Sequence, residues 1–466
     1  MSPIDPLSQL GSAEERENIH FFRHFSSDEL SGFSDSAFWQ RQILQAVHMY
    51  PAIRHAVAGI GALHRKFVEG QEPAVPDDPS DKQLRFALKQ SNKAIREILV
   101  SSSTRSLEDK LTMMAACILF DCLSCLQGHQ TVSLEHIRNG LRLLAEVEQE
   151  VAENADANGH HPVPLNSIRA MFISRNLQAR SIMSNEALHH WEPHPKGGFP
   201  LDSTPFESFT HARTYFESLL NNLLAMIQGM DMNPPADKSH LPAVMEGYEE
   251  MIAQFNTGTR LLDEFLERQV ANGVDREDRA VLSLRLSQIH ARFFLNSFKY
   301  WDGTKEFDWD VDETYFMKMV ELAGRILKDE INRTRLTPLD YQSATSSLPA
   351  RPVFTPGTEV CGALWTVACR SRSHHLRRQA IHLLRTFPRR EGVWDSTVAA
   401  TIAETALGME EAAALAELGT VEQIPRELRV RSCALTYLSL RSAKVEIRNF
   451  RQHMTGQRGI VRYLKW

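Results

Sequence analysis

Apolar residues recur at three- and four-residue steps along most of this chain, which is the spacing of one face of an α-helix. The most apolar stretch is residues 111–126, where most side chains are small or apolar and Asp121 carries the single charge. Ser106 and Asp109 just before it have the spacing of a helix-capping box, and Gln127-Gly128 is typical of a helix end. A second apolar face follows at Leu134, Ile137, Leu141 and Leu144. We therefore predict a helical hairpin over residues 111–150 whose first arm is a buried core helix.

The same spacing predicts helices along the rest of the chain. They cover residues 34–48, 51–63, 82–99, 168–189, 206–230, 243–272, 277–300, 312–332, 359–387 and 396–418. Gly59 and Gly61 each cost about 1 kcal/mol relative to Ala inside a helix, so we expect another element to pack close to the backbone there. Residues 444–450 and 460–466 alternate with a period of two, as in a small hairpin. The fold class is all-α, a large multi-helix antiparallel array with a small C-terminal β-hairpin.

Breaks in the helical pattern indicate how the chain is organised. Residues 1–19 form a polar N-terminal arm, and residues 20–332 form a helical domain with loops at 70–80 and 154–164. Four prolines and a Ser/Thr cluster make residues 333–358 a long Pro/Ser-rich loop and the best internal boundary. Residues 359–466 form a C-terminal helical segment with a β tail, which we expect to pack on the first domain.

The composition limits the classes of function. The net charge is −6 and the pI about 6.4, whereas nucleic-acid or acidic-membrane binding usually shows as a basic excess. The six cysteines lie mostly in apolar runs, as expected for free thiols in a reducing compartment. The start has no signal-peptide pattern, and no stretch reaches the ~18 consecutive apolar residues of a membrane span. We therefore expect a nuclear or cytoplasmic protein without a membrane partner.

Motifs of the common cofactor and metal enzymes are missing from the sequence. It has no G-x-G-x-x-G after a predicted strand, no G-x-x-x-x-G-K-[ST], no H-E-x-x-H and no G-x-S-x-G. Cys122-x-x-Cys125 could place two zinc ligands on one helix face, but no matching second pair accompanies it, so we favour core thiols. A histidine cluster around Trp191 could bind a metal or act as acid and base, although its Pro and Gly neighbours favour a surface loop; it comprises His189, His190 and His194. We expect no cofactor and no metal.

Asp121 is the sharpest anomaly, because a charge on an apolar helix has to be paired, protonated or solvated. We favour a buried ion pair with an arginine such as Arg138 on the next helix. The alternative is a polar anchor in a ligand pocket between helices. If the protein is an enzyme, Asp121, His129 and Arg138 are the catalytic candidates, because they lie in or beside the most apolar helix.

Seven arginines lie within residues 370–390, and this segment contains no acidic residue; the first one after it is Glu391. They are Arg370, Arg372, Arg377, Arg378, Arg385, Arg389 and Arg390. A phosphate-binding helix would have this composition, and so would a helix whose polar face pairs with acids elsewhere on an acidic protein. We favour the second interpretation.

Four parts of the sequence resemble a known family. They are Leu30-Ser31-Gly32 with Phe38-Trp39 and residues 51–57; LKQSNKAI at 88–95; the central segment 116–144; and residues 369–396, followed by Ile424-Pro425 and Arg429-Val430. Together they resemble the fungal-specific regulatory domain, or middle homology region, of fungal zinc binuclear-cluster transcription factors. This type of factor is common among regulators of secondary-metabolism gene clusters. The resemblance extends from about residue 20 to residue 450.

One departure from that family changes the functional expectation. Its members normally open with a basic segment whose six cysteines bind two zinc ions and place a helix in the DNA major groove, and this chain shows no such segment before the regulatory-like region. We therefore expect no direct nucleic-acid binding.

Three functions remain open. The first is a regulator of fungal secondary metabolism without its own zinc-cluster head, which binds a protein partner or a small-molecule metabolite and is compatible with a homodimer. The second is an enzyme repurposed from this fold, an isomerase, cyclase or dehydratase working on a small metabolite in an interhelical pocket. The third is an interaction scaffold. Fold alone does not decide among them, and the resemblance favours the first.

Overall fold

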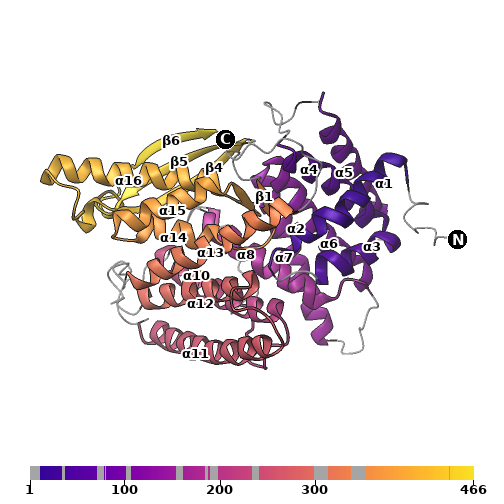
Figure 1. Ribbon diagram of the computed structural model, residues 1–466, viewed down its shortest axis with the longest axis horizontal. Helices are drawn as coiled ribbons and strands as arrows, with labels where there is room; N and C mark the ends of the chain where they lie inside the picture. The colour runs from indigo at the N-terminus through magenta and orange to yellow at the C-terminus, as the bar shows by residue number, and fades with distance from the viewer. Residues whose placement is uncertain are drawn as a thin grey trace. The chain divides into compact units, whose positions relative to one another are not determined.

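The computed structural model describes residues 11–33, 37–70, 78, 80–100, 106–153, 161–183, 187–188, 191, 198–232, 241–298, 313–336, 352–439 and 441–465. This part of the chain is mostly helical with small C-terminal sheets, which confirms the predicted fold class (Figure 1). None of its helices has both the length and the apolar character needed to cross a membrane. Much of the predicted loops lies outside the described residues, as do His189, His190 and His194.

The chain divides into two compact units. Unit 1 comprises Met1–Asn176, Pro352–Thr358 and Arg390–Val393. Unit 2 comprises Leu177–Arg351, Glu359–Arg389 and Trp394–Trp466. The sequence-based domains have different bounds, because the change from one unit to the other falls within helix α8 (Leu165–Ile182) and later segments return to unit 1.

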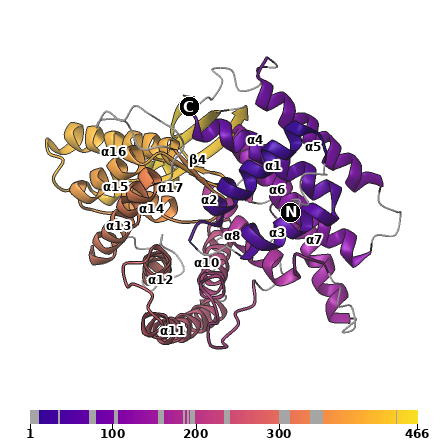
Figure 2. The same ribbon diagram turned by 45° about the vertical axis from the view of Figure 1, so that its right-hand side comes forward.

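Unit 1 is built from consecutive helices (Figure 2). In chain order they are α1 (Ala13–Phe21), the π-helix Phe22–Ser26, α2 (Ser27–Ser31), the π-helix Ala37–Gln42, α3 (Ile43–Met49), α4 (Pro51–Val68), α5 (Lys82–Val100), α6 (Leu107–Gln127), α7 (Gln130–Glu153) and the first part of α8.

Helix α1, which the apolar spacing does not predict, begins within the segment 1–19 that we assigned to a polar arm. Ser12 and Glu15 form a capping box at its start, with the Ser12 amide donating to the Glu15 carboxylate over 2.8 Å. Glu15 is itself buried, because Gln90 and Lys93 donate to the same carboxylate over 2.7 and 2.6 Å. These long-range hydrogen bonds let a polar segment pack against α4. No apolar spacing within the segment indicates that it forms a helix.

Helix α4 is the buried centre of unit 1, with α1, α5 and α6 packed against it. Pro51 occupies its first turn, as predicted. A Cβ on Gly61 would lie 2.2 Å from the carbonyl oxygen of Asn18 in α1, and one on Gly59 would lie 3.3 Å from Leu123 of α6. The close approach expected at these two glycines is therefore confirmed.

The predicted central hairpin is confirmed as α6 and α7. Ser106 and Asp109 form the expected capping box, and Gly128 ends α6 in the left-handed conformation with φ of 85°. Nearly every residue of α6 from Leu111 onward is buried, including Asp121. The first arm of the hairpin is thus a core helix.

Two segments from the C-terminal part of the chain complete the core of unit 1. Strand β1 (Val353–Thr355) places Phe354, which is fully buried, with its ring 6.2 Å from those of His64 and Phe67. Arg390 in β2 (Arg389–Glu391) holds its guanidinium 5.1 Å from the Phe67 ring centre and donates to the Leu126 carbonyl over 3.2 Å. Unit 1 is therefore a discontinuous structure.

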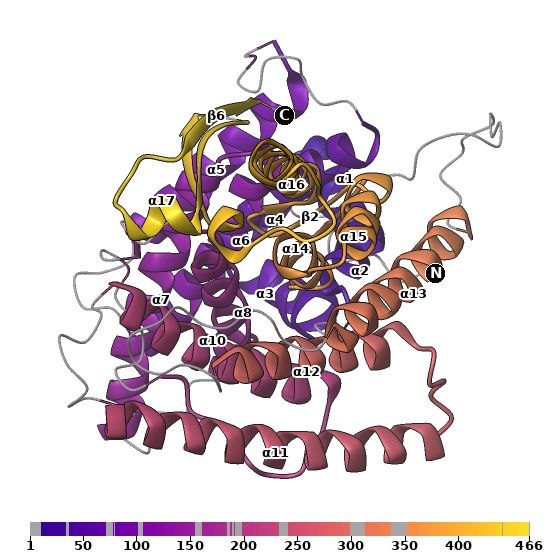
Figure 3. The same ribbon diagram turned by 90° about the vertical axis from the view of Figure 1, so that its left-hand side faces the viewer.

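The helical part of unit 2 begins with long helices around an aromatic core (Figure 3). Helix α11 packs on α10 and α12, and α13 packs on α12. Their bounds are α10 (Phe209–Met232), α11 (Leu241–Ala271), α12 (Arg279–Phe298) and α13 (Thr314–Leu336). Each lies within a few residues of the predicted helix. Tyr248 of α11 packs on Phe298 of α12 at 4.6 Å between ring centres and donates to the Leu295 carbonyl over 3.0 Å.

The remainder of unit 2 contains α14 (Cys361–Arg370), α15 (His374–Thr386), β3 (Trp394–Asp395) and α16 (Ser396–Leu418). The single helix predicted over 359–387 is wrong: the chain breaks at residues 371–373, where the Ser373 hydroxyl caps the start of α15. The prediction of one helix over 396–418 is confirmed by α16.

A three-stranded antiparallel sheet ends the described chain. It runs in the order β4 (Val430–Ser439), β5 (Ser442–Asn449) and β6 (Ile460–Lys465), with a short 3-10 turn (Arg426–Leu428) before β4 and α17 (Phe450–Met454) between β5 and β6. The predicted hairpin is the β5–β6 pair, while β4 was not predicted. Val445 and Ile447 of β5 face the α16 side of the sheet and pack with Val398 and Ile402.

Candidate functional site

The charge on the most apolar helix is neutralised by a buried ion pair within unit 1. Arg175 of α8 places its Nε 2.7 Å from Oδ2 of Asp121, and both side chains are at most 2% exposed. The other carboxylate oxygen accepts a hydrogen bond from the Ser133 hydroxyl of α7 over 2.5 Å and a weaker contact from the Cys125 thiol over 3.5 Å. One carboxylate therefore joins three successive helices.

This network confirms the predicted kind of pairing but not the predicted partner. Asp121 pairs with Arg175, not with Arg138, because α8 rather than the exposed side of α7 faces the carboxylate. His129 lies in the short turn between α6 and α7, and Arg138 is half-buried on α7. An arginine embedded in the apolar pattern around residue 175 was the sequence signal for the true partner.

Cys122 and Cys125 of α6 are core thiols. Burial raises the pKa of Cys122 and of Cys125, with the nearby Asp121 carboxylate raising that of Cys125 further. A thiol with a raised pKa is a poor metal ligand and a poor nucleophile at neutral pH. Across the described ranges no group of three or more His, Cys, Asp or Glu side chains is placed to hold a metal ion.

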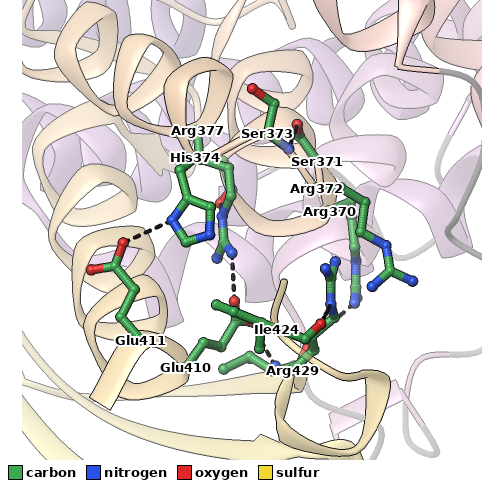
Figure 4. Close-up of polar contacts among 12 residues, drawn as sticks. Arg370, Ser371, Arg372, Ser373, His374, Arg377, Glu410, Glu411, Ile424 and Arg429 are labelled. Atoms are coloured by element: carbon green, nitrogen blue, oxygen red, sulfur yellow. Dashed lines mark hydrogen bonds and ion pairs between the residues drawn. The ribbon is translucent and has the colours of Figure 1, made fainter. Parts of the chain in front are cut away.

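A second network lies in unit 2, where α14, α15, α16 and β4 meet (Figure 4). At its centre Arg377 of α15 pairs with Glu410 of α16, and both side chains are at most 3% exposed. Arg377 also donates through Nε to the Ala368 carbonyl of α14 over 2.8 Å, and the Val430 amide of β4 donates to Glu410 over 2.7 Å. A single buried ion pair therefore holds four elements together.

Further arginines surround this pair. Arg429 donates to the Ile424 carbonyl over 2.9 Å, and burial lowers its pKa to about 10 despite the attraction of Glu410. Arg370 at the end of α14 donates to the carbonyls of Val430 and Arg431. Across the break between α14 and α15, the Arg372 amide donates to Glu313 over 2.6 Å, and so does the Ser371 hydroxyl over 2.8 Å. These contacts tie residues 370–373 to the start of α13 and to β4.

The arginine-rich segment follows the interpretation that we favour from the sequence. Arg378 and His374 both pair with Glu411 of α16, and Arg385 pairs with Glu404, about two helical turns earlier in α16. Arg389 forms a buried ion pair with Glu359. Most of these cations thus have acidic partners within the same unit. The acids of residues 404–411 lie at helical spacing in the sequence, but their role depends on α15 lying beside α16.

Both networks hold structure together. Every carboxylate in them already accepts hydrogen bonds or pairs with a guanidinium, so a proton transfer to a substrate would first have to break these contacts. The networks hold the helices of each unit in place against one another.

Comparison with known proteins adds the family context. Residues 18–247 match the fungal specific transcription factor domain, a segment that includes most of the helices of unit 1 as well as α10 of unit 2. A relative in Emericella nidulans, the aspercryptin biosynthesis cluster-specific transcription regulator, is 24% identical over 460 residues. That alignment covers 83% of this chain and 73% of the relative. Among solved structures, none matches this chain.

Proposed function

Because the chain belongs to the family that carries the fungal specific transcription factor domain, here at residues 18–247, we propose that it regulates the transcription of a fungal secondary-metabolite gene cluster. It acts by binding a protein partner or a metabolite effector, and it works in the nucleus. The family match is the observation that carries this proposal. The name of the Emericella relative supports the link to a biosynthetic cluster.

The placement of the cysteines supports action through partners. All six lie in described elements of the fold: three in α6, two in α14 and one in β4. They are free thiols in folded helices and a strand, so they do not build the zinc cluster by which this type of factor reads DNA. Recruitment or sensing through the helical units is then the role left to this part of the protein.

The enzyme alternative places Asp121, His129 and Arg138 at the reaction centre. Asp121 is 1% exposed and is already bound by Ser133 and Arg175, so its carboxylate would have to leave both before it could act as a base. We therefore retain the regulator as the proposed function.

A tethered reporter tests this proposal with the full chain. The protein is fused to a bacterial DNA-binding protein and expressed in a fungal host with the matching operator upstream of a reporter gene. We expect reporter output to differ from that of the DNA-binding protein alone, and to change when an extract of the producing culture is added if the effector is a metabolite.

Two variants serve as controls in the same assay. Gly61→Val should abolish the effect, because its side chain would collide with the Asn18 carbonyl and open unit 1. Lys318→Glu, an exposed change on α13, should leave it intact. Reporter output equal to that of the DNA-binding protein alone, at equal protein abundance and with or without extract, would contradict the proposal.

A further inference from the structure

The C-terminal sheet of unit 2 carries several exposed apolar side chains. Leu438 on β4 is 53% exposed, Ile460 and Val461 on β6 are each 37% exposed, and Tyr463 is 72% exposed. The pairing register places Val461 opposite Glu446 and Tyr463 opposite Lys444, on the face of β5 that points away from the Val445 and Ile447 side. Val461 and Tyr463 therefore lie on the face of the sheet that α16 does not cover, whereas Ile460, which is opposite Ile447, lies on the α16 side.

Strand β6 is the last strand of the sheet order, so one of its two edges has no strand beside it within the described chain. Figure 1 shows it as the outer strand next to β5. In an antiparallel ladder, alternate residues turn their backbone N–H and C=O groups to each side. An exposed edge that also carries apolar side chains is a template for adding a further strand.

The same edge is positively charged. Arg458, Arg462 and Lys465 are exposed and form no ion pair with any residue that the structure describes. Two neighbouring cations do form ion pairs: Arg448 with Glu446 at 2.7 Å and Arg451 with Glu417 at 2.9 Å. Three cations without an ion pair in the described chain thus follow β6 from just before it to its end, with Arg462, opposite Val445, on the α16 side of the sheet and Lys465, opposite Ser442, on the outer side.

This charge decides which strand fits the edge. A second copy of the chain paired through β6 would bring the same three cations against each other, which is unfavourable. A nucleic acid would satisfy the cations but has no backbone amide groups to continue the ladder. An extended acidic peptide satisfies both, because its main chain pairs with β6 while its carboxylates meet the cations.

We propose that the free edge of β6 binds an extended acidic segment of a partner protein as a fourth strand of the C-terminal sheet. Val461 and Tyr463 provide the apolar contact on the outer face, and Arg458, Arg462 and Lys465 select for acid. This assignment names a partner class for the protein-binding role proposed above and rests on that role for its biological use. The binding itself can be measured without any transcription assay.

The test uses the full-length protein and three fluorescent peptides of about ten residues, a little longer than a typical strand. In the first, Glu alternates with Val; in the second, the same sequence is N-methylated at every residue so that neither edge can donate to a ladder; in the third, Lys replaces Glu. Fluorescence anisotropy should show binding of the first peptide only, weakening as salt is raised. Hydrogen exchange should slow at the amides of β6 when that peptide is bound.

A charge-reversed variant, Arg462→Glu with Lys465→Glu, should bind the acidic peptide at least about tenfold more weakly, because like charges now face each other. Lys318→Glu, a single reversal on α13, serves as the surface-charge control and should bind like the wild type. An unchanged melting temperature shows that the variants remain folded.

The proposal is overturned if the acidic peptide fails to bind, if the N-methylated peptide binds equally well, or if charge reversal has no effect. Binding of a DNA oligonucleotide in place of the peptide would also overturn it and assign the edge to a polyanion. Failure of the reporter assay with intact peptide binding would refute the proposed function alone, and the opposite pattern would refute only the β6 site.

Discussion

Replacing Arg175 with Met should strongly destabilise the centre of unit 1. Arg175 and Asp121 are within 2.7 Å of each other and at most 2% exposed, so the variant leaves a carboxylate buried without a countercharge. Removing one partner of such a pair costs about 3–5 kcal/mol. The Ser133 hydroxyl remains as a donor to Asp121 and offsets a part of this, which places our expectation toward the lower end of the range.

The double variant Arg175→Met/Asp121→Leu separates the cost of an unpaired buried charge from the effect of losing the ion pair itself. Without either charge, no ion remains in the core, so we expect this protein to be more stable than Arg175→Met alone. The Ser133 hydroxyl then lacks its acceptor, which keeps the double variant below the wild type.

Hydrogen exchange read by mass spectrometry is the suitable assay, because a chain of two units need not unfold in one step. Amides in α6 and α7 should exchange faster in Arg175→Met, and the double variant should recover part of their protection. Protection unchanged within about 0.5 kcal/mol in the single variant would refute the role that we assign to this pair.

Three further predictions concern other contacts. Gly61→Ala should lower the melting temperature, since its Cβ would lie 2.2 Å from the Asn18 carbonyl and overpacking costs about 1–3 kcal/mol, whereas Gly247→Ala, with nothing within 4 Å, should not. Burial alone would raise the pKa of Glu15, but hydrogen bonds from Lys93, Gln90 and the Ser12 amide lower it to about 2. Because a lowered pKa stabilises the fold above the unfolded value of about 4.5, the wild type should lose up to about 3 kcal/mol as pH falls from 4.5 toward 2, and Glu15→Gln should not show this loss in acid melts. Glu410→Gln should speed amide exchange in β4 and α15 by leaving Arg377 buried without its carboxylate, a loss of about 3 kcal/mol, and unchanged exchange there would contradict this.

Local signals explain what the sequence predicts well. The caps of α6 and the left-handed Gly128 each depend on a few neighbouring residues, so they can be read from spacing. Two glycines inside the helix at 51–63 indicate a close approach, but the element that approaches, α1 at Gly61, lies far along the chain. The break at residues 371–373 could not, because it depends on Glu313 receiving the Arg372 amide and the Ser371 hydroxyl from far along the chain.

The candidate site shows the same difference between local sequence signals and long-range contacts. That Asp121 needs a buried partner follows from its apolar surroundings alone, but the choice of Arg175 over Arg138 depends on which helix packs against α6. Helix α1 was missed for a related reason, since Glu15 is buried only because Gln90 and Lys93 reach it from α5. Periodicity identifies apolar faces, whereas buried polar contacts between distant segments are set by the tertiary fold.

RNA sequencing tests the central claim most directly, that this protein regulates the genes of a secondary-metabolite cluster. The gene is deleted in the fungus that carries it and then reintroduced as the wild type. We predict that the transcripts of one contiguous set of biosynthetic genes change together on deletion and return on reintroduction. Unchanged transcripts accompanied by loss of a metabolite would contradict the claim and favour an enzyme.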